Sequence, residues 1–188
     1  MPSPTYTLIR SETLASDAAS IDFTSISQSY YDLRFHYSIR VTGAVQGADI
    51  NVTFNNASNV YRGVIMYPEN ATNTRGYAVG ATSSDYAAMI WAAGGNVPGA
   101  STPSGTFSNG RGLVPGYTNS TNLNRRSFGT QSASATSNNN SPSSVMMSGN
   151  QRSNGEAVNR VTFTLASGFG LMAAGSTISL YGCSNTVT

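Results

Sequence analysis

The stretch Ser20–Thr42, SIDFTSISQSYYDLRFHYSIRVT, contains the clearest period-two pattern in the chain. In its second half an apolar set, Leu33, Phe35, Tyr37, Ile39 and Val41, alternates with a polar set, Arg34, His36, Ser38 and Arg40. A repeat of two places each set on its own face of a strand. At roughly 3.3 Å per residue, residues 31–42 span about 40 Å, enough to cross a whole β-sandwich. The sequence therefore predicts a half-buried antiparallel strand over 31–42 as the central strand of a sheet.

Shorter apolar and alternating stretches recur on both sides of this strand. They predict further strands near residues 6–9, 18–23, 48–54, 60–67, 85–92, 112–117, 122–130, 145–148, 160–165 and 177–182. The apolar run at 85–92 also fits a short helix, but its aromatic residues favour a strand that ends at Gly94 and Gly95. We expect 48–54 to form a hairpin with the long strand, and 160–165 to pair with 177–182. Residues 96–110 and 131–144 are expected to be loops.

Many short strands with turn signals between them, and no amphipathic helix, indicate an all-β protein. We predict an antiparallel β-sandwich of jelly-roll type. A length of 188 residues, 39% of them hydrophobic, suits a single domain over 1–188. This domain is expected to have a short N-terminal arm and a loop-rich middle at about 93–155. The predicted core residues are Leu33, Phe35, Ile39, Val52, Phe54, Phe163 and Leu180.

Charged residues are few and unevenly distributed. They make up 10% of the chain, against roughly 25% in ordinary soluble domains, and all ten basic residues are arginine. Residues 86–155 contain four arginines and no acid, namely Arg111, Arg125, Arg126 and Arg152. A segment of this kind fits an acidic partner, and a solvated loop is the alternative interpretation.

Cysteine and apolar runs restrict the class of protein further. Cys183 is the only cysteine, so neither an intrachain disulfide nor a thiolate metal cluster is expected. The thiol fits a small core filler or a partly exposed group after the last strand. No stretch resembles a secretory signal or approaches the ~20 apolar residues of a membrane span. We therefore expect a protein made in a cytoplasm, with no membrane partner.

Residues able to carry chemistry are sparse. His36 is the single histidine, the carboxylates are scattered, and no nucleophile elbow or phosphate-binding loop is present. We expect no catalytic residue, no metal, no cofactor and no nucleic-acid partner. Two alternatives stay open, which are a hydrolase that uses His36 and a glycan-binding protein with an aromatic platform that includes Trp91.

Several short segments together resemble a family of small β-sandwich structural proteins of tailed bacteriophages. They are YTLI (6–9), ASIDFTSI (19–26), YDL (31–33), SIR (38–40), FN (54–55), NVY (59–61) and GSTISLYG (175–182). The order and spacing of the segments carry the resemblance, which covers most of the chain except its middle. Two positions depart from the family pattern: Ser27 stands where relatives often have proline, and Cys183 with a polar tail follows the last segment.

The resemblance implies a virion component and no enzyme. We expect a head decoration (cement) protein, a symmetric trimer on the outer surface of the head that binds the major capsid protein. A tail or fibre component, or a receptor-binding jelly-roll protein, is the alternative. The resemblance and the charge distribution together suggest that four arginines bind the partner, namely Arg111, Arg125, Arg126 and Arg152.

Overall fold

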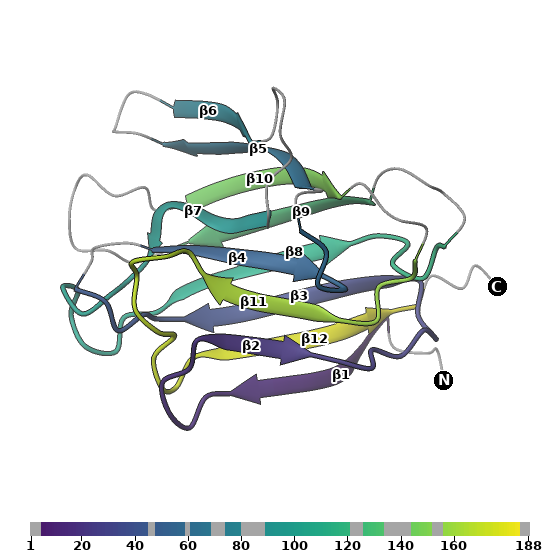
Figure 1. The fold of residues 1–188 in the computed structure, drawn as a ribbon, viewed down its shortest axis with the longest axis horizontal. Coiled ribbons are helices and arrows are strands. Elements are labelled where there is room, and N and C mark those ends of the chain that lie inside the picture. The colour runs from purple at the N-terminus through teal and green to yellow at the C-terminus, as the bar shows by residue number, and fades with distance from the viewer. Residues whose placement is uncertain are drawn as a thin grey trace.

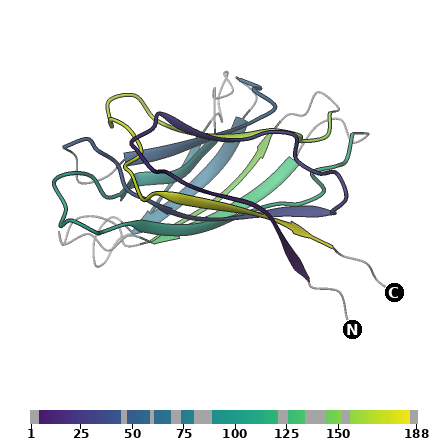
Figure 2. The same ribbon diagram turned by 90° about the horizontal axis from the view of Figure 1, so that it is seen from below.

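The computed structural model describes residues 5–44, 48–58, 61–68, 74–79, 89–120, 126–133, 144–151 and 156–184. For 65–68, 74–79, 89–96, 126–133 and 144–151 the strands are described but not their side chains. Each regular element in these ranges is a β-strand, and the strands form two antiparallel sheets that pack as two layers (Figure 1 and Figure 2). The predicted all-β antiparallel sandwich is confirmed.

The larger sheet has eight strands in the order β1-β12-β3-β8-β9-β10-β5-β6, and the smaller has four in the order β2-β11-β4-β7. The strands of the larger sheet are β1 (Tyr6–Thr13), β12 (Thr177–Cys183), β3 (Asp32–Ile39), β8 (Ser108–Val114), β9 (Arg126–Ala133), β10 (Ser144–Gln151), β5 (Tyr61–Pro68) and β6 (Thr74–Val79). Those of the smaller sheet are β2 (Ser20–Phe23), β11 (Val161–Leu165), β4 (Ala48–Phe54) and β7 (Met89–Val97).

Eight of the strands are wound as one long antiparallel hairpin that has been rolled up. In such a hairpin the first strand pairs with the last, the second with the next to last, and so on inwards. All four pairs are present, as β1–β12, β2–β11, β3–β8 and β4–β7. This winding is that of a jelly roll. The other four strands form the hairpins β5–β6 and β9–β10, which extend the larger sheet beyond β8 (Figure 1).

The core lies between the inner faces of the two sheets. On β3 the side chains alternate as predicted: Leu33, Phe35, Tyr37 and Ile39 are buried, whereas His36 is exposed. All seven predicted core residues are fully buried. Rings from three strands meet at the centre, because Phe35 and Phe23 lie 5.4 and 6.2 Å from the ring centroid of Phe163. Both contacts are edge to face, and the one between Phe35 and Phe163 connects the two sheets.

Two predicted strand pairings are wrong. Residues 48–54 do not form a hairpin with the long strand, because β4 pairs with β11 and β7 in the smaller sheet. Likewise β11 and β12 lie in different sheets, where β12 pairs with β1 and β3. The physical reason is the rolled winding, which places most strands that follow one another in the chain in opposite sheets. A period of two identifies the buried face of a strand but not the strand beside it.

The middle of the chain contains more strand than its composition indicates. Gly94 and Gly95 do not end β7, which continues to Val97, and β8 begins at Ser108 inside the expected loop. β9 and β10 also lie in the segment expected to be rich in loops. Ladder hydrogen bonds use only the backbone, so small polar residues can form strands between neighbours that supply the apolar contacts.

The first expected strand, at residues 6–9, is the start of β1, which pairs with β12 at the edge of the larger sheet. Residues 1–4, in which the rest of the expected arm lies, fall outside the described residues. In the part of the chain that is described, no helix has the length and apolar character needed to cross a membrane.

Candidate functional site

The outer face of the larger sheet brings three basic side chains together. His36 and Arg34 alternate on the outward side of β3, two residues apart. In the register of β3 with β8, Arg111 lies directly opposite His36, and Leu113 lies opposite Arg34. Directly opposite residues on one face of a sheet have Cβ atoms about 5 Å apart. Arg34, His36 and Arg111 therefore form one cluster, which we call the Arg–His face.

Two tyrosines border the Arg–His face. The guanidinium carbon of Arg34 lies 4.6 Å from the ring centroid of Tyr6 in β1, which is cation–π geometry. On β12 the ring of Tyr181 meets the His36 ring edge to face, with centroids 5.4 Å apart. Tyr6 is 45% exposed, so its ring can contact a partner. The tyrosine rings orient Arg34 and His36 and supply apolar area beside the charges.

The electrostatics of the cluster depend on its neighbours. Partial desolvation lowers the pKa of His36, and the positive charges of Arg34 and Arg111 lower it further. One carboxylate, Asp32, begins β3 and accepts a hydrogen bond from the backbone N–H of Gly116 at 2.7 Å. Near neutral pH the face therefore contains two arginine charges beside a neutral imidazole.

One of the four predicted partner-binding arginines is placed in this cluster. Arg111 is exposed on β8. Arg126 begins β9, which pairs with β8, but its side chain lies outside the described part. Arg125 and Arg152 fall outside the described residues. Their role stays a prediction.

Arg34 and His36 were not among the predicted partner-binding residues, although the alternation over 31–42 places both on the polar face. The charges were grouped by their position along the chain, and Arg34 lies in the part that also contains acids.

Arg40 belongs to the same alternating set but lies beyond the end of β3. Its guanidinium donates to the Thr102 Oγ1 and to the carbonyl oxygens of Thr102, Pro103 and Thr106, at 2.9 to 3.0 Å. Arg40 therefore organises the loop before β8.

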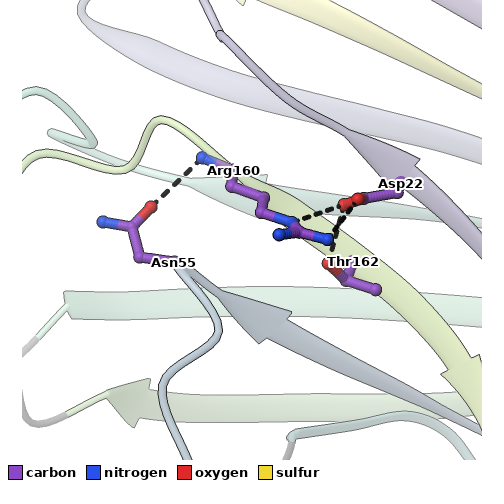
Figure 3. A network of polar contacts seen from close by, with 4 residues as sticks. All are labelled: Asp22, Asn55, Arg160 and Thr162. Carbon is purple, nitrogen blue, oxygen red and sulfur yellow. Dashed lines mark hydrogen bonds and ion pairs between the residues drawn. The ribbon is translucent and has the colours of Figure 1, made fainter.

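A second polar cluster lies on the smaller sheet and joins its strands (Figure 3). Asp22 on β2 accepts hydrogen bonds from the Nε of Arg160 at 2.9 Å and from the hydroxyl of Thr162 at 2.8 Å. The Oδ1 of Asn55, just after β4, accepts from the backbone N–H of Arg160 at 3.1 Å. Partial burial alone raises the pKa of Asp22, but the hydrogen bonds from Arg160 and Thr162 and the Arg160 charge outweigh it and lower the pKa.

This second cluster is satisfied internally, which indicates a structural role. Its fork of Arg160 on Asp22 connects β2 to the start of β11, and Asn55 connects β4 to the same point. The Arg–His face lies on the outward side of the larger sheet, where His36 and Arg111 are exposed. We therefore treat the Arg–His face as the candidate site.

The other residues with possible chemistry are placed as follows. Cys183 is buried at the end of β12, so the interpretation as a core filler is confirmed. Trp91 lies in β7, and its side chain is outside the described part. Among the described residues, no group of three or more His, Cys, Asp or Glu side chains could hold a metal ion.

Comparisons with known proteins identify no family. No protein-family model matches the chain, and no curated protein matches it. Among solved structures, the exoplasmic/lumenal domain of VIP36 in a Ca²⁺/Man3GlcNAc-bound form is 11% identical, with a TM-score of 0.35, and the match covers 98% of this chain and 86% of that one. The Ruminococcus gnavus IT-sialidase CBM40 bound to α2,6-sialyllactose is 7% identical, with a TM-score of 0.30, and covers 95% and 96%. Values this low carry no functional inference, so the fold assignment rests on the strand order itself.

Proposed function

We propose that the protein is a non-enzymatic virion protein of a tailed bacteriophage that decorates the outer surface of the head. In this proposal the Arg–His face binds acidic groups of the major capsid protein and helps to hold neighbouring capsid subunits together. The observation that carries the proposal is the meeting of Arg34, His36 and Arg111 on one outward sheet face.

The chemistry of this face favours a carboxylate-bearing partner. Each guanidinium offers parallel N–H donors that match the two oxygens of a carboxylate, which gives geometric specificity as well as attraction. The pairing of β3 with β8 fixes the backbone positions of Arg34 and Arg111 relative to each other, and the Tyr6 ring lies against the Arg34 guanidinium.

The fold and the sequence resemblance support the same reading. A single jelly roll is an architecture found in viral capsid domains as well as in lectins. The resemblance of the segments at 6–9, 19–26 and 175–182 to small phage virion proteins favours the capsid role over the lectin role. We further propose that the protein acts as a trimer, because capsid lattices present three-fold positions and a closed ring satisfies each subunit's interface.

Glycan binding is the second candidate function, and the exposed ring of Tyr6 against Arg34 favours it. Aromatic rings stack on sugar faces, and an adjacent arginine suits an acidic sugar. Binding to a glycan array that is lost in Tyr6→Ala, in a protein that does not bind capsids, would support this function and contradict decoration.

Cryo-electron microscopy of the virion that contains this chain tests the proposal directly. We expect many copies on the head surface, with the Arg–His face toward capsid subunits. A few copies confined to the tail would contradict decoration. In a binding assay with capsids stripped of the protein, Arg34→Ala with Arg111→Ala is expected to weaken binding at least about tenfold, because two charge-assisted contacts are lost.

Arg62→Ala is the matched control for this assay. Arg62 is exposed on the same sheet, but β5 lies three strands from β8, about 14 Å away. We expect this variant to bind capsids like the wild type. Equal losses in the control and in the double variant would show non-specific charge attraction and contradict a defined docking face. Variants of Arg125, Arg126 and Arg152 in the same assay test the remaining predicted contacts.

A further inference from the structure

His36 stands between two arginines on the Arg–His face, in a position where a bound acid changes its preferred charge. We infer that His36 takes up a proton when this face binds a carboxylate-bearing protein segment, so that docking tightens as the pH falls. The inference rests on the proposed function and adds to it the regulation of the same site.

The geometry makes His36 sensitive to a partner. Its side chain is exposed on β3, opposite Arg111 across the strand pair and two residues from Arg34. On the other side, β12 places Ser179 opposite it and the Tyr181 ring against its own. The imidazole therefore lies beside two cations and is also accessible from solvent.

Among the described residues, the titratable or charged groups on the strands beside His36 are Arg34 and Asp32 on β3, Arg111 on β8 and Tyr181 on β12. The buried Cys183 lies farther along β12, opposite Asp32. The Asp32 carboxylate lies at the far end of β3 and accepts a hydrogen bond from Gly116. Arg34 and Arg111 are thus the charges that lower the pKa of His36.

A bound carboxylate reverses this balance. It neutralises the field of Arg34 and Arg111 and adds a negative charge beside the imidazole, which favours the protonated form. Binding therefore raises the pKa of His36, and thermodynamic linkage requires that protonation strengthen binding by the same factor. The pH window of interest lies between the pKa of His36 in the free protein and its higher pKa in the complex. If the partner increases the proton affinity of His36 tenfold, the binding affinity below this window is about tenfold higher than above it.

The sign of the effect is defined at both ends of the window. Above the pKa of the complex, His36 is neutral both free and bound, so affinity does not change with pH. Between the higher pKa of the complex and the lower pKa of the free protein, affinity rises as pH falls. Below both, the histidine is charged in each state and the dependence on His36 ends.

Because His36 is the only histidine, its titration can be followed without ambiguity. The first test records the His36 ring proton resonances by NMR between about pH 5 and about pH 8, with and without a hexaglutamate peptide. We expect the peptide to raise the pKa of His36, and to do so much less in Arg34→Ala with Arg111→Ala. Binding of the peptide with an unchanged His36 titration would overturn the inference.

Dextran sulfate is the competing probe in this experiment. A rise in the pKa of His36 with dextran sulfate but not with hexaglutamate would show that the face binds sulfated glycans. It would contradict the inference that the partner is a carboxylate-bearing protein segment. A response to hexaglutamate that survives about 150 mM salt supports specific recognition, because exposed long-range attraction is largely screened there.

The second test measures capsid binding at about pH 5.5 and about pH 7.5 for the wild type and for His36→Gln, which cannot take up a proton. We expect the wild type to bind about threefold to tenfold more tightly at the lower pH, and His36→Gln to lose this difference. Equal pH dependence in both proteins would contradict proton uptake at His36.

The two proposals fail in different ways. If the protein binds capsids at neither pH but hexaglutamate raises the pKa of His36, the decoration proposal is contradicted. The same result would support proton-coupled recognition of carboxylates. Capsid binding that is independent of pH, with no response of His36 to hexaglutamate, would overturn proton coupling and leave decoration standing.

Discussion

The backbone of Gly110 lies directly beneath the ring of Tyr37: a Cβ built on this glycine would come within 2.2 Å of the ring's Cζ and Oη. The two residues are paired in the register of β3 with β8. Gly110→Ala therefore forces the Tyr37 ring or the strand to move, and we expect a loss of about 1–3 kcal/mol in the free energy of unfolding. Urea denaturation measures this loss.

A double-mutant cycle separates this clash from a general effect on β8. In a Tyr37→Leu background the ring is absent, so Gly110→Ala is expected to cost less than half as much there. The same cost in both backgrounds would show that Tyr37 does not determine the requirement for glycine.

The hydroxyl of Tyr61 serves as a hydrogen-bond acceptor for the backbone at the end of β4. It accepts a hydrogen bond from the backbone N–H of Phe54 at 2.8 Å in a buried position, and burial raises the pKa of Tyr61 to about 12. Tyr61→Phe leaves that N–H without its acceptor, so we expect the free energy of unfolding to fall by about 1–3 kcal/mol. Tyr31→Phe is the control, since Tyr31 is 61% exposed. Similar effects of both substitutions on thermal unfolding would argue against the role of this hydrogen bond.

Asp22 makes the stability of the fold depend on pH in the acid range. Its pKa is lowered below the ordinary value of 3.8, because the hydrogen bonds from Arg160 and Thr162 and the Arg160 charge outweigh the effect of burial. The unfolded chain therefore binds a proton at Asp22 more readily, and stability is lost as pH falls through the folded-state pKa.

Asp22→Asn should remove this part of the pH dependence. We expect the wild type to lose stability more steeply than Asp22→Asn in urea titrations between about pH 5 and about pH 2.5. Arg160→Lys keeps the charge without the fork and should fall between them. Parallel pH profiles for wild type and Asp22→Asn would contradict the prediction.

Cys183 reports on unfolding of β12. The side chain is 4% exposed, and burial raises the pKa of its thiol. We expect a thiol reagent near neutral pH to modify the folded protein at least about a hundredfold more slowly than the urea-unfolded chain, because the reactive thiolate is rare and covered. Rapid modification under native conditions would mean that the end of β12 opens readily.

The alternation over 31–42 was sufficient to predict which side chains of β3 are buried. It did not predict the neighbours of the strand, because a repeat of two records only the face. β4 shows the difference: Val52 and Phe54 are buried as expected, yet the strand lies in the opposite sheet from β3. The pairing depends on the winding of the whole chain.

The candidate site was predicted in part for the same reason. Arg34 and His36 share a face by alternation, and Arg111 was identified from its acid-free segment. Their meeting depends on the pairing of β3 with β8, which neither local pattern specifies. Arg40 shows a second limit, since its hydrogen bonds to Thr102, Pro103 and Thr106 follow from where β3 ends rather than from the alternation.

The place of β12 between β1 and β3 determines when the larger sheet can assemble. Strands β1 and β3 do not pair with each other; each pairs with β12, whose residues 177–183 are synthesised after all the other described strands. Contacts this distant in sequence slow folding, commonly to milliseconds or seconds. During translation β1 therefore has no partner in this sheet, with Tyr6 and Leu8 among its side chains, and this part of the sheet forms only after residue 183 has been added. The rolled winding thus makes completion of the larger sheet wait for the last of the described strands.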